Sequence, residues 1–361
     1  MDKKKRVLFI GSFIKVNSDG GTGGQLFACT SLLESDLFKQ FEFVLVDSST
    51  KLPIPNILGR IFKAYKRLLI SFYHLCFSRI DSVLVFSADG LSIIEKGVIC
   101  ILAKKIGKKV IIAPRSGFLL NDLKNRKLKW FIGLVFLNSD FVICQGNAWK
   151  LIFMRNFPLL DSSKFVEVMN WIDLKKYKSI IDKDQESNEI TFLFLGWIER
   201  EKGVEDLIKA VGLVEENGFK VILAGNGSYF DDANKLIREL NIEKKVELIG
   251  WVDFNTKLAL LKLADVFILP SHFEGMPNAI MEAMASGLPI ISTLVGGIPD
   301  MVIHDENGKL GDVKNPIFLS NSISYFINNT SEIHRMALNS EMLVVRNHNI
   351  TQASKKISSL L

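Results

Sequence analysis

The sequence predicts an α/β protein built from two doubly wound, Rossmann-like domains. Its 361 residues exceed what a single hydrophobic core usually covers. Short apolar runs alternate with helical patterns, which is typical of parallel sheets covered by helices. The polar stretch 175–189 divides these runs into two series. The expected strands are 7–10, 43–46, 82–86, 109–112 and 141–144 in the first series, and 191–195, 220–224, 246–248, 266–269 and 289–292 in the second. 

The division between the two series places the domain boundary within 170–177. We therefore expect one domain over residues 1–172 and a second over 173–361, with the last helix able to pack back on the first domain.

Charge is distributed unevenly between the two expected domains. The chain carries a formal net charge of +6, but residues 1–171 hold 25 Lys and Arg against 13 Asp and Glu, whereas the remainder holds 20 against 26. Such asymmetry indicates that the first domain faces an anionic partner. An acidic glycan and an anionic membrane remain open, and no nucleic-acid-binding motif supports a nucleic-acid partner.

Composition and cysteine spacing favour a cytoplasmic protein. The four cysteines are scattered without a CxxC pair, which is typical of reduced thiols. The basic start followed by the apolar run 7–10 fits a first strand better than a signal peptide. No apolar stretch reaches the ~18 residues that a membrane span requires.

Two segments of the first half have an amphipathic and basic pattern. Residues 57–78 and 121–137 combine Lys and Arg with Phe, Leu, Ile and Trp. Such helices can lie on an anionic bilayer, which would make the protein peripheral to the inner face of the cell membrane. They can equally be ordinary domain helices with one solvated basic face.

The segment 270–299 carries the most chemistry. It follows the buried strand 266–269, at the carboxyl end where open α/β sheets bind ligands. Pro277 suits the first turn of the helix 278–286, whose free amides favour a phosphate. Glu274 in the loop and Glu282 in the helix could bracket a polyhydroxylated ligand. Gly296-Gly297 offers a second close backbone approach.

These residues form a recognisable pattern. Glu274 and Glu282 stand in an E-x7-E arrangement between a buried strand and a Gly-Gly-Ile-Pro turn, with Lys202-Gly203 upstream. With these motifs the chain resembles the retaining GT-B glycosyltransferases of the glycosyltransferase 4 type, whose two Rossmann-like domains face each other across a cleft. The resemblance covers nearly the whole chain and is strongest over 191–311, where it includes Phe194-Leu-Gly196, Ala224-Gly-Asn-Gly227 and Leu248-Ile-Gly250.

The resemblance implies roles for the matching positions. Glu274 would contact hydroxyls of the donor sugar, and Glu282 would hydrogen-bond the ribose. Lys202 would neutralise the diphosphate leaving group, which stabilises charge that develops during transfer. The other donor-side positions implied are the backbone at Gly275, Met276, Pro277 and Asn278 for sugar and phosphate, Gly250 and Val252 beside the base, and Gly24 in the glycine-rich loop of the first domain.

Three positions depart from the pattern of the family. Trp197 stands where members often carry Arg, and the nearby Arg200 would either replace that cation or point to solvent. Arg115 stands where many members place His. Because arginine is always protonated, it cannot act as a general base, and it would instead bind a phosphate or an acidic acceptor. We count Arg115 with Glu274 and Lys202 among the catalytic candidates. Asn170-Trp171 replaces the usual Asn-Gly at the domain junction.

The resemblance also implies a reaction. A sugar would move with retention from a UDP- or GDP-type donor to a glycan or lipid-linked glycan, as in bacterial surface polysaccharide synthesis. We expect no cofactor and no metal ion, because Asp182-x-Asp184 falls in a polar linker and not at a strand end. The alternatives are a nucleotide-sugar epimerase or glycan phosphorylase on the same fold, and a non-catalytic GT-B scaffold or binding partner.

Overall fold

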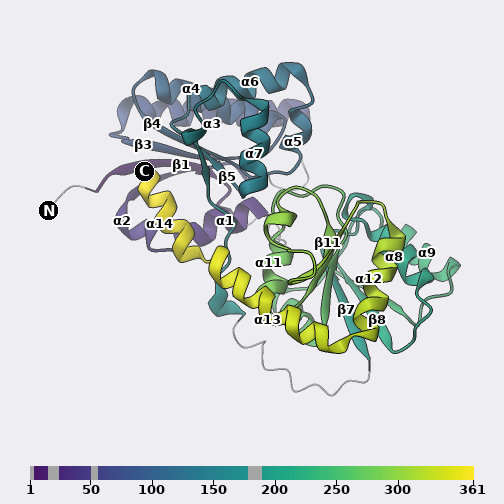
Figure 1. Cartoon of the computed structure of the whole chain (residues 1–361). Helices are drawn as coiled ribbons and strands as arrows, with labels where there is room; N and C mark the ends of the chain where they lie inside the picture. The colour runs from purple at the N-terminus through teal and green to yellow at the C-terminus, as the bar shows by residue number, and fades with distance from the viewer. Residues whose placement is uncertain (1–3, 15–23, 50–55, 178–188) are drawn as a thin grey trace. The chain divides into compact units, whose positions relative to one another are not determined.

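The computed structural model describes residues 4–14, 24–49, 56–177 and 189–361, and it contains two parallel six-stranded sheets (Figure 1). The chain divides into two compact units. The first comprises residues 1–171 and 350–361, and the second comprises residues 172–349. The expected α/β class with two Rossmann-like sheets is confirmed.

The first unit contains a parallel sheet with strand order β2-β1-β3-β4-β5-β6. Apolar residues such as Phe9, Leu84 and Ile111 are fully buried because the sheet is covered on both faces. The strands are β1 (Arg6–Gly11), β2 (Glu42–Asp47), β3 (Ser82–Ser87), β4 (Lys109–Pro114), β5 (Phe141–Cys144) and β6 (Phe165–Glu167).

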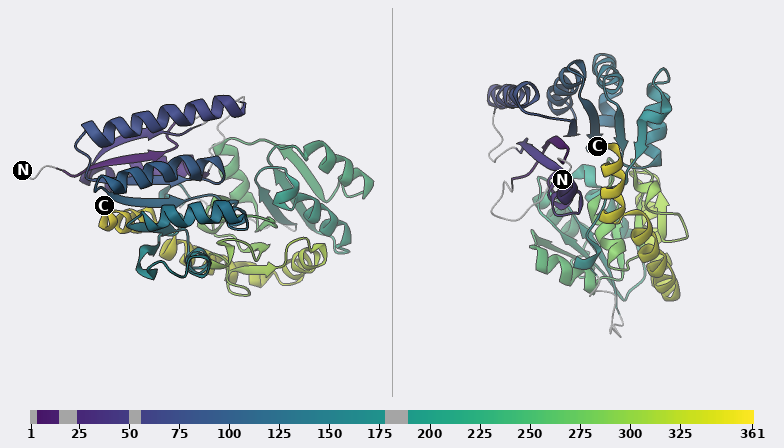
Figure 2. Two further views of the ribbon diagram at one scale, coloured as in Figure 1. Left: turned by 90° about the horizontal axis from the view of Figure 1, so that it is seen from above. Right: turned by 90° about the vertical axis from the view of Figure 1, so that its left-hand side faces the viewer.

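Helices cover the two faces of the first sheet with different partners. On one face α3 (Ile57–Phe77), α4 (Leu91–Lys105) and α6 (Arg126–Leu137) lie side by side (Figure 2). On the other face the final helix α14 (Ile350–Leu360) packs with α1 (Gly24–Leu33) and α2 (Leu37–Gln40). Ile357 of α14 is buried in the same core as Val7 and Phe9. Two short helices, α5 (Leu119–Asp122) and α7 (Asn147–Asn156), complete the unit.

The second unit repeats this plan with strand order β12-β11-β10-β7-β8-β9. Its strands are β7 (Ile190–Leu195), β8 (Phe219–Ala224), β9 (Val246–Gly250), β10 (Val266–Leu269), β11 (Ile290–Thr293) and β12 (Gly308–Gly311). Its helices are α8 (Val204–Leu213), α9 (Phe230–Glu239), α10 (Phe254–Leu263), α11 (Asn278–Ala285), α12 (Pro316–Asn328) and α13 (Thr330–Asn347), with a 3₁₀ turn, η4 (Arg200–Lys202), after β7.

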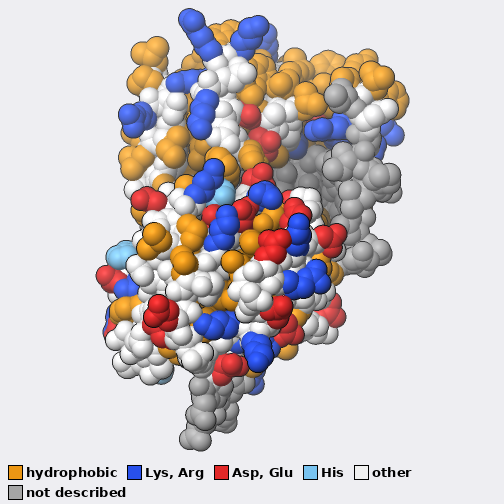
Figure 3. Space-filling view, turned by 90° about the vertical axis from the view of Figure 1, so that its right-hand side faces the viewer, with side chains coloured by type: hydrophobic (Ala, Val, Ile, Leu, Met, Phe, Trp, Pro, Cys, Tyr) orange, Lys and Arg blue, Asp and Glu red, His pale blue; other side chains and the backbone are white. Residues whose placement is uncertain are grey.

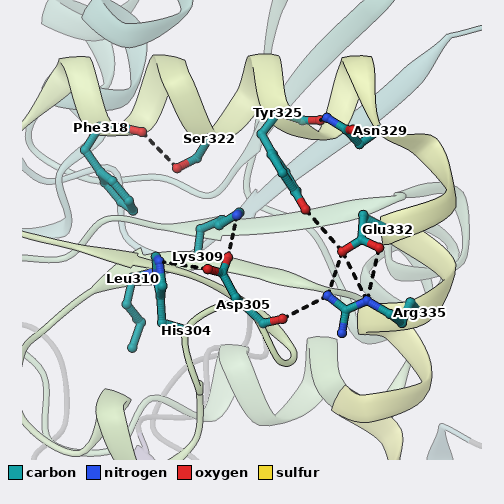
Figure 4. A network of polar contacts seen from close by, with 10 residues as sticks. All are labelled: His304, Asp305, Lys309, Leu310, Phe318, Ser322, Tyr325, Asn329, Glu332 and Arg335. Atoms are coloured by element: carbon teal, nitrogen blue, oxygen red, sulfur yellow. Dashed lines mark hydrogen bonds and ion pairs between the residues drawn. The ribbon is translucent and has the colours of Figure 1, made fainter.

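A polar network fastens α12 and α13 to the edge of the second sheet (Figure 4). Glu332 of α13 accepts from Tyr325 of α12 at 3.1 Å and pairs with Arg335 at 2.6 Å. Arg335 also donates to the carbonyl of Asp305 at 2.8 Å, and Lys309 of β12 lies 3.5 Å from the Tyr325 ring centroid. This network is structural, because its partners come from the outer edge of the sheet and its flanking helices.

Candidate functional site

The turn at Lys202 and Gly203 packs directly against the loop that follows β10. Gly203 has a φ of +72°, and a Cβ on it would lie 2.0 Å from the carbonyl oxygen of Pro270. Only glycine fits such a left-handed position in contact with another backbone. Gly203 thereby brings η4 against the β10–α11 loop and sets the position of Lys202.

The two residues predicted to act on the donor meet in this loop. Lys202 Nζ lies 2.6 Å from Oε1 of Glu274, and the hydroxyl of Ser271 donates to the same oxygen at 2.8 Å. The Glu274 side chain is only 10% exposed. Because both contacts use Oε1, the second carboxylate oxygen remains available to accept a hydrogen bond from a ligand hydroxyl.

Glu282 has the same arrangement on the first turns of α11. Lys257 Nζ of α10 lies 2.6 Å from its Oε1, and the Tyr177 hydroxyl donates to this oxygen at 3.1 Å. Burial and the neighbouring Glu282 carboxylate raise the pKa of Tyr177, so its phenol stays protonated and donates. Glu282 is therefore held by two donors through one oxygen, like Glu274.

Further hydrogen bonds fix the β10–α11 loop. His272 Nε2 lies 2.6 Å from Oδ2 of Asp206 in α8, and the His272 amide donates to the carbonyl of Glu201 at 2.8 Å. The Thr293 hydroxyl at the end of β11 donates to the carbonyl of Ser271 at 2.5 Å. The loop is thus pinned from both neighbouring strand ends, which limits the movement of Glu274.

Gly296 and Gly297 contact this loop as well. A Cβ on Gly296, at φ +55°, would lie 2.0 Å from the Glu274 carbonyl oxygen, and the Gly297 amide donates to the carbonyl of Gly275 at 2.6 Å. The close approach predicted from the Gly-Gly pair is therefore an approach to the Glu274 loop. It supports the site and occupies the backbone carbonyl of Gly275.

Helix α11 begins at Asn278, immediately after the candidate loop. Pro277 is the N-cap residue and precedes the helix. The sequence had predicted Pro277 within the first turn. Pro277 gives this helix no side-chain capping hydrogen bond. The first amides of a helix have no intrahelical acceptor and carry partial positive charge, so this end of α11 suits a phosphate. Met276 is buried just before it.

Gly250 and Val252, the positions predicted beside the base, lie at the end of β9, in the same sheet as the ends of β7 and β8. A Cβ on Gly225 would lie 1.7 Å from the Gly196 carbonyl oxygen, so these two strand ends pack backbone to backbone. Gly250 closes β9 with a φ of +74°, and a Cβ on it would meet no atom within 4 Å; Val252 follows half-buried. Trp197 and Trp251 are both exposed here, with ring centroids 6.0 Å apart. Flat apolar rings of this kind suit a nucleobase.

Arg200 is directed to other partners than the site glutamates. Its guanidinium lies 2.7 Å from Glu205 and 4.5 Å from the ring centroid of Tyr229, and the side chain is 61% exposed. The structure therefore gives Arg200 a surface pairing, whereas Lys202 is the cation that reaches Glu274.

Arg115 and Gly24 belong to the first unit. The Arg115 guanidinium lies over the rings of Trp171 and Phe86, at 4.7 and 5.1 Å from their centroids. Its NH1 is buried and has no hydrogen-bond partner in the described part of the chain. Burial lowers the pKa of Arg115 to about 10, so it stays charged at neutral pH. Gly24 is the exposed first residue of α1.

Sequence reasoning missed Lys257, Ser271 and the role of Tyr177. Lys257 and Tyr177 lie 25 and 105 positions from Glu282, so no local spacing connects them. The available signal was Tyr177 itself, the one aromatic residue in the polar stretch 175–189, which the structure shows to be buried.

Two Rossmann-like units, each built on a parallel sheet, are typical of the GT-B fold. The second unit carries the paired glutamates and the lysine. Residues 177–342 match the family model described as Glycosyl transferases group 1. The second unit is thus similar to this family of glycosyltransferases.

Individual relatives agree with this assignment. An uncharacterized glycosyltransferase of Methanocaldococcus jannaschii is 35% identical over 132 residues, covering 36% of this chain and 34% of that protein. The match thus spans about a third of this relative. The UDP-Gal:alpha-D-GlcNAc-diphosphoundecaprenol alpha-1,3-galactosyltransferase of Escherichia coli is 26% identical, covering 72% of this chain and 70% of that protein.

Solved structures match the fold over the whole chain. Sucrose-phosphate synthase from Thermosynechococcus elongatus superposes with a TM-score of 0.82 at 17% identity, covering 99% of this chain and 98% of that one. Anabaena HepE in complex with UDP and glucose gives a TM-score of 0.71 at 17% identity, covering 98% of each chain.

Proposed function

We propose that this protein transfers a sugar from a nucleoside-diphosphate donor to a glycan or lipid-linked glycan, with retention of anomeric configuration. The observation that carries the proposal is the pair of glutamates in the second unit. Glu274 and Glu282 are each held through Oε1 by a lysine at 2.6 Å, which leaves the other oxygen for ligand hydroxyls. In this proposal Glu274 binds the donor sugar and Glu282 binds the ribose.

Lys202 supplies the positive charge for the departing diphosphate. The α11 amides at Asn278 lie on the same loop and add partial positive charge. The bond from C1 to the diphosphate oxygen breaks while the acceptor oxygen attacks C1 from the same face. The acceptor's proton passes to an oxygen of the leaving diphosphate, so no protein nucleophile is needed. Positioning and electrostatics then account for catalysis, and Lys202 takes the role that a divalent cation plays in other transferases.

The acceptor belongs to surface polysaccharide synthesis and is presented at a membrane. The E. coli relative is named for a diphosphoundecaprenol-linked acceptor and a UDP-sugar donor. None of the helices in the described segments is long and apolar enough to cross a membrane. The basic, amphipathic α3 instead provides a surface for peripheral contact, consistent with a cytoplasmic location on an anionic inner leaflet.

Calorimetry tests the donor site directly. The purified protein is titrated with UDP, GDP and ADP, with and without Mg²⁺, and Lys202→Ala and Glu282→Ala are compared with it. Lys262→Ala, an exposed position of α10, is the matched control. We expect saturable, metal-independent binding of one nucleotide that weakens about tenfold or more in both site variants, a loss of at least ~1.4 kcal/mol. If folded protein binds no nucleotide at millimolar concentration, the transferase proposal fails in favour of a GT-B scaffold.

A glycosyl assay separates the transferase from an epimerase on the same fold. An epimerase converts a sugar nucleotide without an acceptor, whereas a transferase releases the nucleoside diphosphate only as it glycosylates an acceptor. Product analysis with and without a lipid-linked glycan therefore decides between them.

A further inference from the structure

The first unit contains a cavity that the donor site does not use. Its volume is about 550 Å³, and α3, α4 and the ends of β1, β2 and β3 contribute to its walls. Ser12, Ser48 and Ser92 provide hydroxyl groups, and Arg60, Lys63 and Lys96 provide positive charge. The cavity lies at the carboxyl ends of parallel strands, where open α/β sheets bind ligands.

Lys96 is a buried cation in the wall of this cavity, and no ion pair with a described carboxylate neutralises it. The residue is 4% exposed, and Nζ donates to the Ser92 hydroxyl at 2.8 Å. The adjacent Glu95 is instead engaged by Arg67, whose Nε and NH2 each lie 2.6 Å from a Glu95 oxygen. Within the described residues, no Asp or Glu lies within ion-pair distance of Lys96. A buried, uncompensated ammonium is costly for the free protein and is well suited to an anionic ligand.

The helix that forms one wall provides a second, independent feature. Residues 57–77 contain no Asp or Glu. Arg60, Lys63 and Arg67 lie on the cavity side, at helical spacing. The outer face carries a stripe of exposed apolar side chains at spacings of four and seven: Leu58, Phe62, Leu69, Tyr73 and Phe77. Figure 3 shows apolar side chains interspersed with Lys and Arg along the upper edge of the face in view.

We propose that this cavity binds the diphosphate group of a lipid-linked acceptor, with Lys96 at its base and the apolar stripe of α3 against the lipid. The inference rests on the proposed function and identifies where the acceptor's anionic group is held. A soluble phosphate would use the cation but would leave the apolar stripe without a role. A purely apolar chain would leave the Lys96 charge uncompensated. An anionic group joined to an apolar chain satisfies both.

Three small probes separate these contributions. Farnesyl diphosphate carries the anion and an apolar chain, inorganic pyrophosphate carries only the anion, and farnesol carries only the chain. We expect farnesyl diphosphate to bind about tenfold or more tightly than either of the others, and Lys96→Met to weaken it about tenfold, which corresponds to ~1.4 kcal/mol. Lys105→Met, an exposed position near the end of α4, is the control and should bind as the wild type.

Measurements of stability and binding on Lys96→Met test this cavity separately from the donor site. Methionine fills a similar volume without a charge, so Lys96→Met should melt no lower than the wild type, and lost binding will not reflect unfolding. Equal binding of farnesyl diphosphate by Lys96→Met and wild type overturns the proposal. Equal binding of pyrophosphate and farnesyl diphosphate overturns the lipid-linked source. Binding of UDP, GDP and ADP is measured on the same samples. Absence of binding of all three would overturn the proposed function. Retained nucleotide binding, with farnesyl diphosphate affinity unchanged in Lys96→Met, would overturn this inference alone.

Discussion

Lys202 Nζ lies 2.6 Å from Oε1 of Glu274, although the two residues are 72 positions apart in the chain. Neither residue could reach the other without the close backbone contact at Gly203, where a Cβ would lie 2.0 Å from the Pro270 carbonyl oxygen. In the Lys-Gly pair, Lys202 therefore supplies the positive charge and Gly203 allows the backbone conformation that positions it. The glycine and the lysine act together on one glutamate.

Replacing Gly203 by alanine should displace Lys202 from Glu274. The φ of +72° and the clash with Pro270 predict a loss of about 2–4 kcal/mol in the free energy of unfolding. Nucleotide affinity should fall as well. Gly212→Ala is the control, because Gly212 lies within helix α8 and a Cβ on it would make an ordinary contact with Leu240, at 3.4 Å. This substitution should be neutral or slightly stabilising. Urea unfolding and UDP calorimetry measure both effects. Equal stability of the two variants would contradict the role assigned to Gly203.

Lys257→Met should weaken nucleotide binding without unfolding the protein. Lys257 holds Oε1 of Glu282 at 2.6 Å, and without it the Tyr177 hydroxyl at 3.1 Å remains to orient the carboxylate. We expect a three- to tenfold loss in UDP affinity, about 1 kcal/mol. Lys262→Met on the exposed face of the same helix should have no effect. An unchanged affinity in Lys257→Met would show that Glu282 does not contact the nucleotide or does not need this lysine.

Arg200→Gln should have little effect on donor binding. The sequence left open whether Arg200 replaces a cation missing at Trp197 or points to solvent, and the structure pairs it with Glu205 and places it over Tyr229. An exposed pair of this kind contributes about 0–1 kcal/mol. We expect UDP affinity within twofold of wild type, compared with a tenfold or greater loss in Lys202→Ala. A loss of UDP affinity in Arg200→Gln as large as that in Lys202→Ala would show that Arg200 acts as the cation missing at Trp197.

The strands of both sheets could be predicted from the sequence because buried parallel strands are continuous apolar runs. Residues 141–144 and 266–269 were predicted with the observed bounds. The edge strands β6 and β12 were missed. β6 has three residues, and β12, Gly308–Gly311, begins and ends with glycine. A Cβ on Gly308 would lie 2.0 Å from the Ile290 carbonyl oxygen, so this strand is defined by a tertiary contact that its own sequence does not reveal.

The candidate site shows the same limit. Glu274, Glu282 and Lys202 were predictable because each sits in a local motif at a strand end or helix start. Lys257 and Tyr177 were not, because they reach Glu282 from separate elements through the fold. The direction of Arg200 was also unpredictable, since it depends on α8 and α9 acids that local spacing does not place.

The cost of burying Lys96 should be visible as a pH dependence of stability. Burial lowers the pKa of Lys96 from 10.5 to about 8, and the nearby Arg67 charge lowers it further by a smaller amount. Glu95, Cys29 and Asp47 act in the opposite direction and raise this pKa. Below pH 8 the lysine is protonated in both the folded and the unfolded protein, so the penalty is fully present. Between pH 8 and 10.5 the unfolded chain holds the proton that the folded protein releases, so stability contributed at this site rises with pH.

Lys96→Met should therefore be more stable than wild type at pH 7, by on the order of 1–3 kcal/mol. This advantage should shrink as the pH approaches 10, because the wild-type lysine becomes neutral when folded. Urea unfolding of both proteins at several pH values measures the difference, and Lys105→Met should show no such trend. A bound diphosphate next to Lys96 favours the protonated amine, so affinity for farnesyl diphosphate should fall as pH rises through about 8. A pH-independent stability difference would show that Lys96 is not the buried cation that the cavity presents to its ligand.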